Sequence, residues 1–334
     1  MRPALLLTRL LAEPSLVAGL KVDWTSLLTA ARAESLLGTL AFRLQGQALP
    51  DPVEAILASV RADAAQGKVQ ALWEAEMARR ALVPAGVEAI LLKGTAYAAA
   101  GLDPAEGRSI GDLDILVPRA SLPQTEQALL AAGWEWVKED AYDDHYYRTW
   151  MHELPPLIHR ERDRMIDVHH TILPLTARRR PDPEAMVAAS VPLPDGLRVL
   201  SPEDMICHAA AHLFADGDLA GGLRNLWDID RLLRQFSAAD GFWRRLHERA
   251  SLHQLLAPVH RAGRLANDLY GTPLPEGWRV WDRADPLYRA RLLARDGWGR
   301  TTRPALRFGF YVRSHWLRMP PAMLARHLLK KARR

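Results

Sequence analysis

Apolar side chains recur at intervals of three and four residues over the first 80 positions, which is the period of an amphipathic helix. The pattern is clear from Trp24 to Ala31 and from Ala55 to Val60, on either side of Pro50-Asp51-Pro52. A separate helix is expected from Lys68 to Leu82. Residues 1–82 therefore form a predicted N-terminal helical region.

The pattern then changes to short apolar runs of strand length, bounded by Gly and Pro. Helices are expected between some of them, one of them capped by Ser121 and ended by Gly133. Mixed strands and helices predict a small α/β core at residues 83–180. The predicted strands are Val87–Leu92, Leu113–Val117, Trp134–Val137, Glu153–His159 and Met165–Ile172.

Helical periodicity returns after a proline-rich stretch, so residues 181–334 form a predicted C-terminal helical region with a basic tail. Ser201-Pro202-Glu203-Asp204 marks a helix start, because Ser201 can cap the helix and Pro202 suits its first position. The predicted fold class is α+β, with a small mixed-sheet core flanked by two helical regions.

Composition narrows the class of protein. The 334 residues are 49% hydrophobic and 25% charged, which is typical of a folded globular protein. A single cysteine, Cys207, excludes an internal disulfide framework and favours a cytoplasmic location. No run of 18 uncharged apolar residues occurs, so no transmembrane segment is expected, and the first residues do not resemble a signal peptide.

The charge is concentrated at one end of the chain. Ten Lys and Arg residues and no acid lie from Arg300 onward, while the rest of the chain has a net charge of −5. The positive net charge of the chain therefore comes from its tail, and does not indicate a nucleic-acid-binding surface over the whole protein. The tail could contact an anionic membrane peripherally, or form a last helix that packs Leu324 and Leu328 onto the domain. The packed helix is preferred, because the tail has few apolar positions for a helix that lies in a membrane interface.

Two aspartates interrupt a strand that otherwise has the sequence of a buried one. Asp112 and Asp114 in Gly-Asp-Leu-Asp-Ile-Leu-Val project to the same side, since side chains alternate along a strand. Two such close carboxylates repel each other unless a cation lies between them. Paired carboxylate oxygens suit Mg²⁺, with Mn²⁺ as an alternative.

A third aspartate, Asp167, stands in the later strand Met-Ile-Asp-Val-His, where an unpaired charge would be costly. If the two strands are neighbours, three carboxylates converge, which is enough for a two-metal site that catalyses phosphoryl displacement. His169 shares a face with Asp167 and is either a supporting residue of that site or a half-buried strand histidine.

These motifs occur in a recognisable order: a strand ending in Lys93-Gly94-Thr95, then Arg-Ser-Ile-Gly-Asp-Leu-Asp, then Asp-Val-His. The order resembles the uncharacterised nucleotidyltransferase family of the DNA polymerase β superfamily. The resemblance implies that Asp112 and Asp114 bind the metals and that Asp167 completes the site and orients or deprotonates the acceptor. It also implies that Gly94 and Thr95 hold the triphosphate.

Two features near this motif leave more than one interpretation. Thr95 stands where the superfamily has a serine, and keeps the hydroxyl. Lys93 and Arg108 match residues common in the family, and their charge suggests phosphate binding, although Arg108 is equally suited to pairing with a nearby carboxylate.

A Cys-His-Ala-Ala-Ala-His segment places His208 and His212 four residues apart on one helix face, as in some zinc sites. The glutamate of those sites is missing, so a packing role for His212, with Asp228 as a possible partner, is preferred.

The function predicted from these residues is metal-dependent nucleotidyl transfer. The enzyme would move a nucleoside monophosphate from an NTP such as ATP to a small molecule, a protein or tRNA, releasing pyrophosphate. Two alternatives remain: a non-catalytic nucleotide-binding or partner-binding protein on the same fold, and a toxin-type nucleotidyltransferase acting on tRNA or protein.

Overall fold

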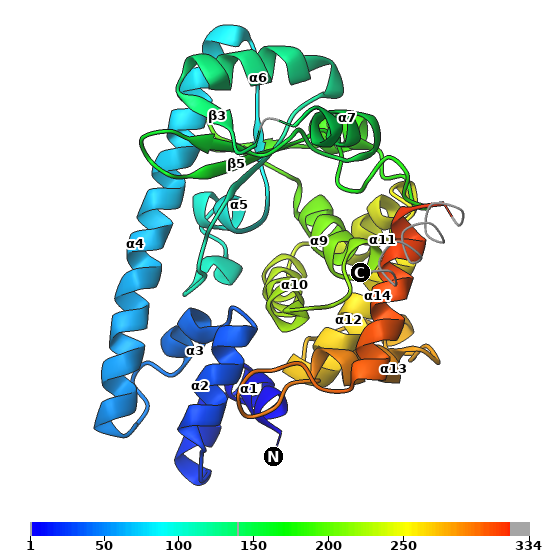
Figure 1. Ribbon diagram of the computed structural model, residues 1–334. Coiled ribbons are helices and arrows are strands. Elements are labelled where there is room, and N and C mark those ends of the chain that lie inside the picture. Colours follow the sequence, from blue (N-terminus) through cyan, green and yellow to red (C-terminus); the bar gives the residue numbers. More distant parts are fainter. Residues whose placement is uncertain (1, 139, 321–334) are drawn as a thin grey trace.

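A computed structural model describes residues 2–138 and 140–320 of the chain (Figure 1). Helices precede and follow a mixed β-sheet, and the buried apolar side chains of all three parts join in one hydrophobic core. The predicted α+β fold class is confirmed.

The N-terminal helices are α1 (Pro3–Ala12), α2 (Trp24–Ala33), α3 (Leu37–Arg43) and α4 (Asp51–Leu82). Two separate helices were predicted after Pro50, and this was wrong: α4 is one helix of 32 residues that runs along one side of the molecule (Figure 1). The connecting stretch around residues 61–67 is rich in alanine and other helix formers, so the helix continues through it even though few apolar residues mark its face.

The sheet has seven strands in the order β3-β4-β5-β2-β1-β7-β6 within the described residues. All five predicted strands exist, although most are shorter than expected. The sheet also extends past residue 180, because two short strands from the proline-rich stretch pair beside β1. The strands are β1 (Ile90–Leu91), β2 (Leu113–Leu116), β3 (Trp134–Trp136), β4 (Leu157–His159), β5 (Met165–His169), β6 (Val191–Pro192) and β7 (Arg198–Val199).

Three helices from the central part of the chain surround this sheet: α5 (Lys93–Ala99), α6 (Leu122–Ala131) and α7 (Ala141–Trp150). Figure 1 shows α6 on one side of the sheet and α5 on the other. Ser121 is the residue before α6, as predicted, but its side chain makes no capping hydrogen bond. The helix α7 was not predicted; it carries mostly polar and aromatic residues.

The C-terminal helices lie on the α5 side of the sheet, and α12 packs against α1 of the N-terminal helices (Figure 1). The predicted cap of α9 is confirmed, since the Ser201 hydroxyl accepts a hydrogen bond from the Asp204 amide at 3.2 Å. The helices are α8 (Pro183–Ala188), α9 (Pro202–Ala211), α10 (Gly222–Phe236), α11 (Phe242–Leu252), α12 (Leu256–Tyr270), α13 (Asp285–Leu292) and α14 (Pro304–Arg318), with a π-helical turn at His212–Asp216.

Across residues 2–138 and 140–320, no helix has the length and apolar character needed to cross a membrane. The tail positions Leu324 and Leu328 lie outside the described residues, so the last helix stays a prediction.

Candidate active site

The predicted acids come together at the centre of the sheet. Strands β2 and β5 are parallel neighbours, and their register places Asp114 directly opposite Asp167. Residues opposite each other in a sheet project from the same face, so these two carboxylates are adjacent. Asp112 lies two residues before Asp114, is exposed to solvent, and contributes its charge to the electrostatic environment of Asp167.

Asp114 is the buried member of this group. Its Oδ1 accepts hydrogen bonds from Lys93 Nζ at 2.6 Å and from His169 Nε2 at 3.0 Å. Burial acts against ionisation, but the hydrogen bond from His169 and the charge of Lys93 outweigh it and hold the pKa of Asp114 well below its usual range. Asp114 is therefore a carboxylate, and both bonds end on the same oxygen.

Asp167 and a further acid, Glu153, have the opposite shift. Burial raises the pKa of both carboxyl groups; the charge of Asp114 adds to the shift of Asp167, and the charge of Asp167 adds to that of Glu153. A cation between them would relieve this repulsion. The sequence prediction missed Glu153 as a site residue; the available signal was a charged residue at the start of the predicted strand Glu153–His159.

Lys93 is the first residue of α5, two residues after the end of β1, and has a φ of 49°, a left-handed conformation that is uncommon for a residue with a side chain. This turn lets the side chain reach back to Asp114. Burial disfavours the charged ammonium, but the neighbouring Asp114 more than compensates and raises the pKa of Lys93. Lys93 is thus a cation held inside the acidic cluster.

Gly94 is needed because of the side chain that lies against it. A Cβ at this position would be 2.6 Å from Arg108 Nε. Arg108 is itself buried and pairs with Asp228 of α10, whose other oxygen accepts from Arg224. Of the two roles considered for Arg108, the structure therefore shows the pairing with a carboxylate. The binding of phosphate by Arg108 stays a prediction.

Thr95 is buried in α5, and with Gly111 and Asp112 it lines a small hollow beside the start of β2. The hollow brings the predicted phosphate-binding turn next to the first of the predicted metal ligands. The predicted roles of Thr95 and Gly94 in holding a triphosphate are not contradicted by this placement, and they remain predictions.

His208 lies buried in α9 on the side of the sheet that carries the acids. Burial lowers its pKa well below the usual value, and the charge of Lys93 acts in the same direction. A neutral, buried imidazole suits a packing role for His208. His212, for which a packing role was preferred, begins the π-helical turn after α9 and is exposed.

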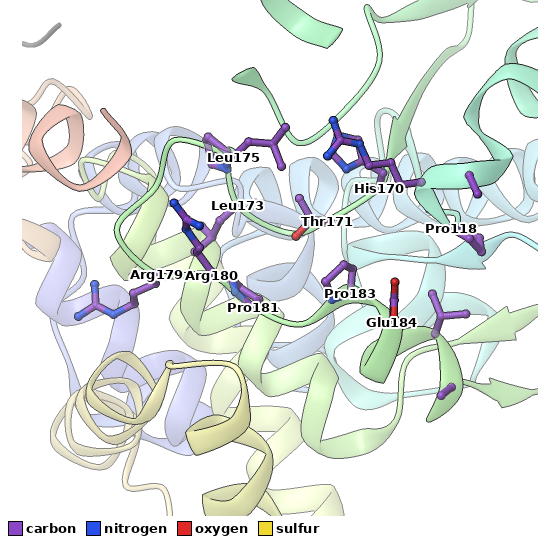
Figure 2. Close-up of a pocket in the computed structure, with 15 residues that line it drawn as sticks. Pro118, His170, Thr171, Leu173, Leu175, Arg179, Arg180, Pro181, Pro183 and Glu184 are labelled. Atoms are coloured by element: carbon purple, nitrogen blue, oxygen red, sulfur yellow. The ribbon is translucent and has the colours of Figure 1, made fainter. Parts of the chain in front are cut away.

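A larger cavity of about 520 Å³ opens where β2 and β5 end. Figure 2 shows the segment from His170 to Pro183 curving around it. Most of its lining is apolar, from prolines, leucines and the α8 residues Val187 and Ala188. Arg119, Arg179 and Arg180 add positive charge, and Glu184 adds one negative charge. A cavity of this size, mainly apolar with a few charged groups, is typical of a site that binds a small molecule or a side chain of another protein.

Comparison with protein-family models gives one match, described as "Uncharacterised nucleotidyltransferase", over residues 21–271. The match spans three quarters of the chain, and the chain belongs to this family. Membership supports nucleotidyl transfer in general, and with it an NTP substrate. A search of curated proteins found no match to the chain.

Proposed function

We propose that this protein is a Mg²⁺-dependent nucleotidyltransferase, with Asp112, Asp114 and Asp167 as the metal ligands and Mn²⁺ as an alternative ion. The observation that carries the proposal is the register of β2 and β5, which sets Asp114 opposite Asp167 on one face, with Asp112 two residues earlier. Three carboxylates fit a pair of such ions, since each Mg²⁺ uses one or two carboxylates together with substrate phosphates.

The contacts of Asp114 suit such a ligand. Lys93 and His169 both bond its Oδ1, so Oδ2 is the oxygen that would face a cation. The bound ions would neutralise charge on the phosphates during transfer. Lys93 adds a fixed positive charge on the same side, and Thr95 lines a small hollow together with Asp112.

In the proposed reaction an oxygen of the acceptor forms a bond to the α-phosphorus of the NTP, and the bond from that phosphorus to the bridging oxygen of pyrophosphate breaks. Asp167, which lies half-buried beside Asp114, orients the acceptor hydroxyl and takes its proton. Pyrophosphate leaves with the negative charge.

The acceptor pocket we infer is the cavity of about 520 Å³ at the ends of β2 and β5. Pro118 at its edge follows Asp114 by four residues, which is roughly 13 Å along an extended strand. Apolar walls with Arg119, Arg179 and Arg180 suit an acceptor with an apolar body and a negative group. We expect the reaction to take place in the cytoplasm, since the one cysteine, Cys207, is a free buried thiol.

The test is label transfer from ATP or another NTP in the presence of host lysate, with the label at either the α- or the γ-phosphate. Nucleotidyl transfer moves the α-label to an acceptor and releases the γ-label as pyrophosphate. Asp112→Asn should abolish both, whereas Asp163→Asn, a matched change at an exposed hairpin tip with a left-handed backbone that asparagine tolerates, should have no effect.

The outcome also separates the alternatives. Nucleotide binding without release of pyrophosphate would mean a non-catalytic binding protein. Growth arrest on expression, lost in Asp112→Asn, with label on tRNA or protein, would mean a toxin-type enzyme. Full transfer by Asp112→Asn would refute the assignment of the metal ligands.

A further inference from the structure

Beside the aspartates lies a second group of side chains with a different chemistry. His152, Glu153 and His169 each offer one ligand atom, and these atoms all lie within 4.8 Å of one another. Two nitrogens and one carboxylate oxygen form a softer donor set than the carboxylates of Asp112, Asp114 and Asp167. Imidazole donors are typical of sites for Zn²⁺ and related transition metals, while Mg²⁺ prefers oxygen.

The backbone holds this group in place. Glu153 forms an isolated antiparallel bridge with His169 at the end of β5, so the two residues lie directly opposite each other. The Leu154 amide donates to the Val168 carbonyl at 2.9 Å, and the His170 amide donates to the His152 carbonyl at 2.9 Å. The segment that carries His152 and Glu153 is therefore fixed against β5 before any ion binds, which is the preorganisation that a metal site needs.

Both imidazoles have a buried nitrogen without a hydrogen-bond partner. His169 Nδ1 and His152 Nδ1 are orphaned in this way, and the His169 side chain is only 3% exposed. Buried polar atoms without a partner are rare and costly in native structures, because they lose their bonds to water. A metal ion bound at His169 Nδ1 would accept the lone pair of that nitrogen and remove its cost. His152 would bind instead through Nε2, its nitrogen near Glu153.

The spacing of the donors fits a small ion with four ligands. His169 Nδ1 lies 3.5 Å from Glu153 Oε2, and His152 Nε2 lies 3.6 Å from the same oxygen. In a tetrahedral zinc site with bonds near 2.0–2.1 Å, neighbouring ligand atoms are about 3.3 Å apart. Small side-chain adjustments would therefore bring both nitrogens and the oxygen to coordination distance.

The second ring nitrogen of His169, Nε2, contacts a carboxylate, as it usually does in a metal-bound histidine. Its Nε2 lies 3.0 Å from Asp114 Oδ1. A histidine that binds metal through one nitrogen typically donates its other N–H to a carboxylate, which fixes the tautomer and the ring orientation. His169 thus has a carboxylate on Nε2 and an empty, buried Nδ1 that points to Glu153.

We propose that His152, Glu153 and His169 form a binding site for a transition metal of the Zn²⁺ type, separate from the carboxylate site and joined to it through the hydrogen bond from His169 to Asp114. Three protein ligands leave a fourth position open for water or a substrate oxygen.

The test is metal content of the full-length chain. The protein is stripped with a chelator, dialysed against Zn²⁺ and washed, and the bound zinc is measured by elemental analysis, with the visible absorption of Co²⁺ as a report of coordination. We expect one tightly bound zinc per chain. It should be lost in His152→Ala and in Glu153→Gln, which changes little in shape, and kept in His145→Ala, an exposed histidine of α7.

The zinc content of two further variants distinguishes this site from the carboxylate site, with no measurement of activity. Asp112→Asn should keep its zinc, and Asp114→Asn should bind zinc about 10- to 100-fold more weakly, the usual cost of losing the carboxylate behind a metal-bound histidine. Zinc that is lost in Asp112→Asn but kept in His152→Ala and Glu153→Gln would lie at the aspartates and overturn the proposal. A wild-type chain that retains no zinc would also overturn it.

Discussion

Asp112 and Asp114 should differ sharply in what they contribute to folding, although both are proposed to bind the same ions. Asp114→Asn removes a buried carboxylate that holds Lys93 through a 2.6 Å ion pair, whereas Asp112 is exposed. Without metal, we expect Asp114→Asn to destabilise the protein and Asp112→Asn to leave its free energy of unfolding close to that of the wild type.

The size of the effect follows from what is left behind. The Asp114 side chain is 10% exposed and the Lys93 side chain 29%. Removing one partner of a fully buried pair costs about 3–5 kcal/mol, because the other charge is left uncompensated. Lys93 keeps some contact with water, which reduces the penalty, and asparagine can still accept a hydrogen bond, so we expect a loss of about 1–3 kcal/mol.

The assay is urea unfolding followed by circular dichroism at neutral pH, with chelator present. Lys93→Met is made alone and together with Asp114→Asn, so that the double-mutant cycle isolates the pair from other effects of each change. Once Lys93 is uncharged, Asp114→Asn should cost markedly less. Equal stability of Asp112→Asn and Asp114→Asn in the wild-type background, or no coupling in the cycle, would refute the role given to the Lys93–Asp114 pair.

Two more predictions concern packing and pH. Gly94→Ala should lower the free energy of unfolding by about 1–3 kcal/mol, the range for an overpacked site, because the new methyl group meets Arg108. Thermal unfolding compares this variant with Gly111→Ala, where a Cβ meets nothing within 4 Å. Equal melting temperatures of the two variants would contradict the prediction. Burial opposes ionisation of Asp204, but its bonds from His253 and Arg249 lower its pKa. Its contribution to stability is therefore complete above the unfolded pKa of about 3.9 and is lost as the pH falls below it. Asp204→Asn should flatten this acid-side decline in unfolding experiments from about pH 2 to pH 5, and an unchanged slope would count against it.

The alternation of apolar and acidic residues was enough to predict the two strands that carry the acids. Leu113, Ile115 and Val117 alternate with Asp114, and Ile166 and Val168 flank Asp167, so both strands could be inferred from the sequence, whereas their pairing was only a condition of the prediction and is shown by the fold. The prediction worked because the period of a strand is two residues and does not depend on its neighbours.

Other features depend on contacts that a local pattern does not contain. The strands β6 and β7 are two residues each and exist because β1 offers an edge for pairing. Helix α4 continues through a polar stretch where apolar periodicity is weak. The bonds of Lys93 and His169 to Asp114 required the left-handed turn at Lys93 and the pairing of β2 with β5, and Glu153 entered the site only through its bridge to His169.

A crystal structure of the chain with Mn²⁺ and a non-hydrolysable NTP analogue, with the ions located by their anomalous scattering, tests the proposed metal site directly. We expect manganese bound by Asp112, Asp114 and Asp167, with the triphosphate beside Gly94 and Thr95. A nucleotide bound elsewhere, with no ion on these three carboxylates, would contradict it.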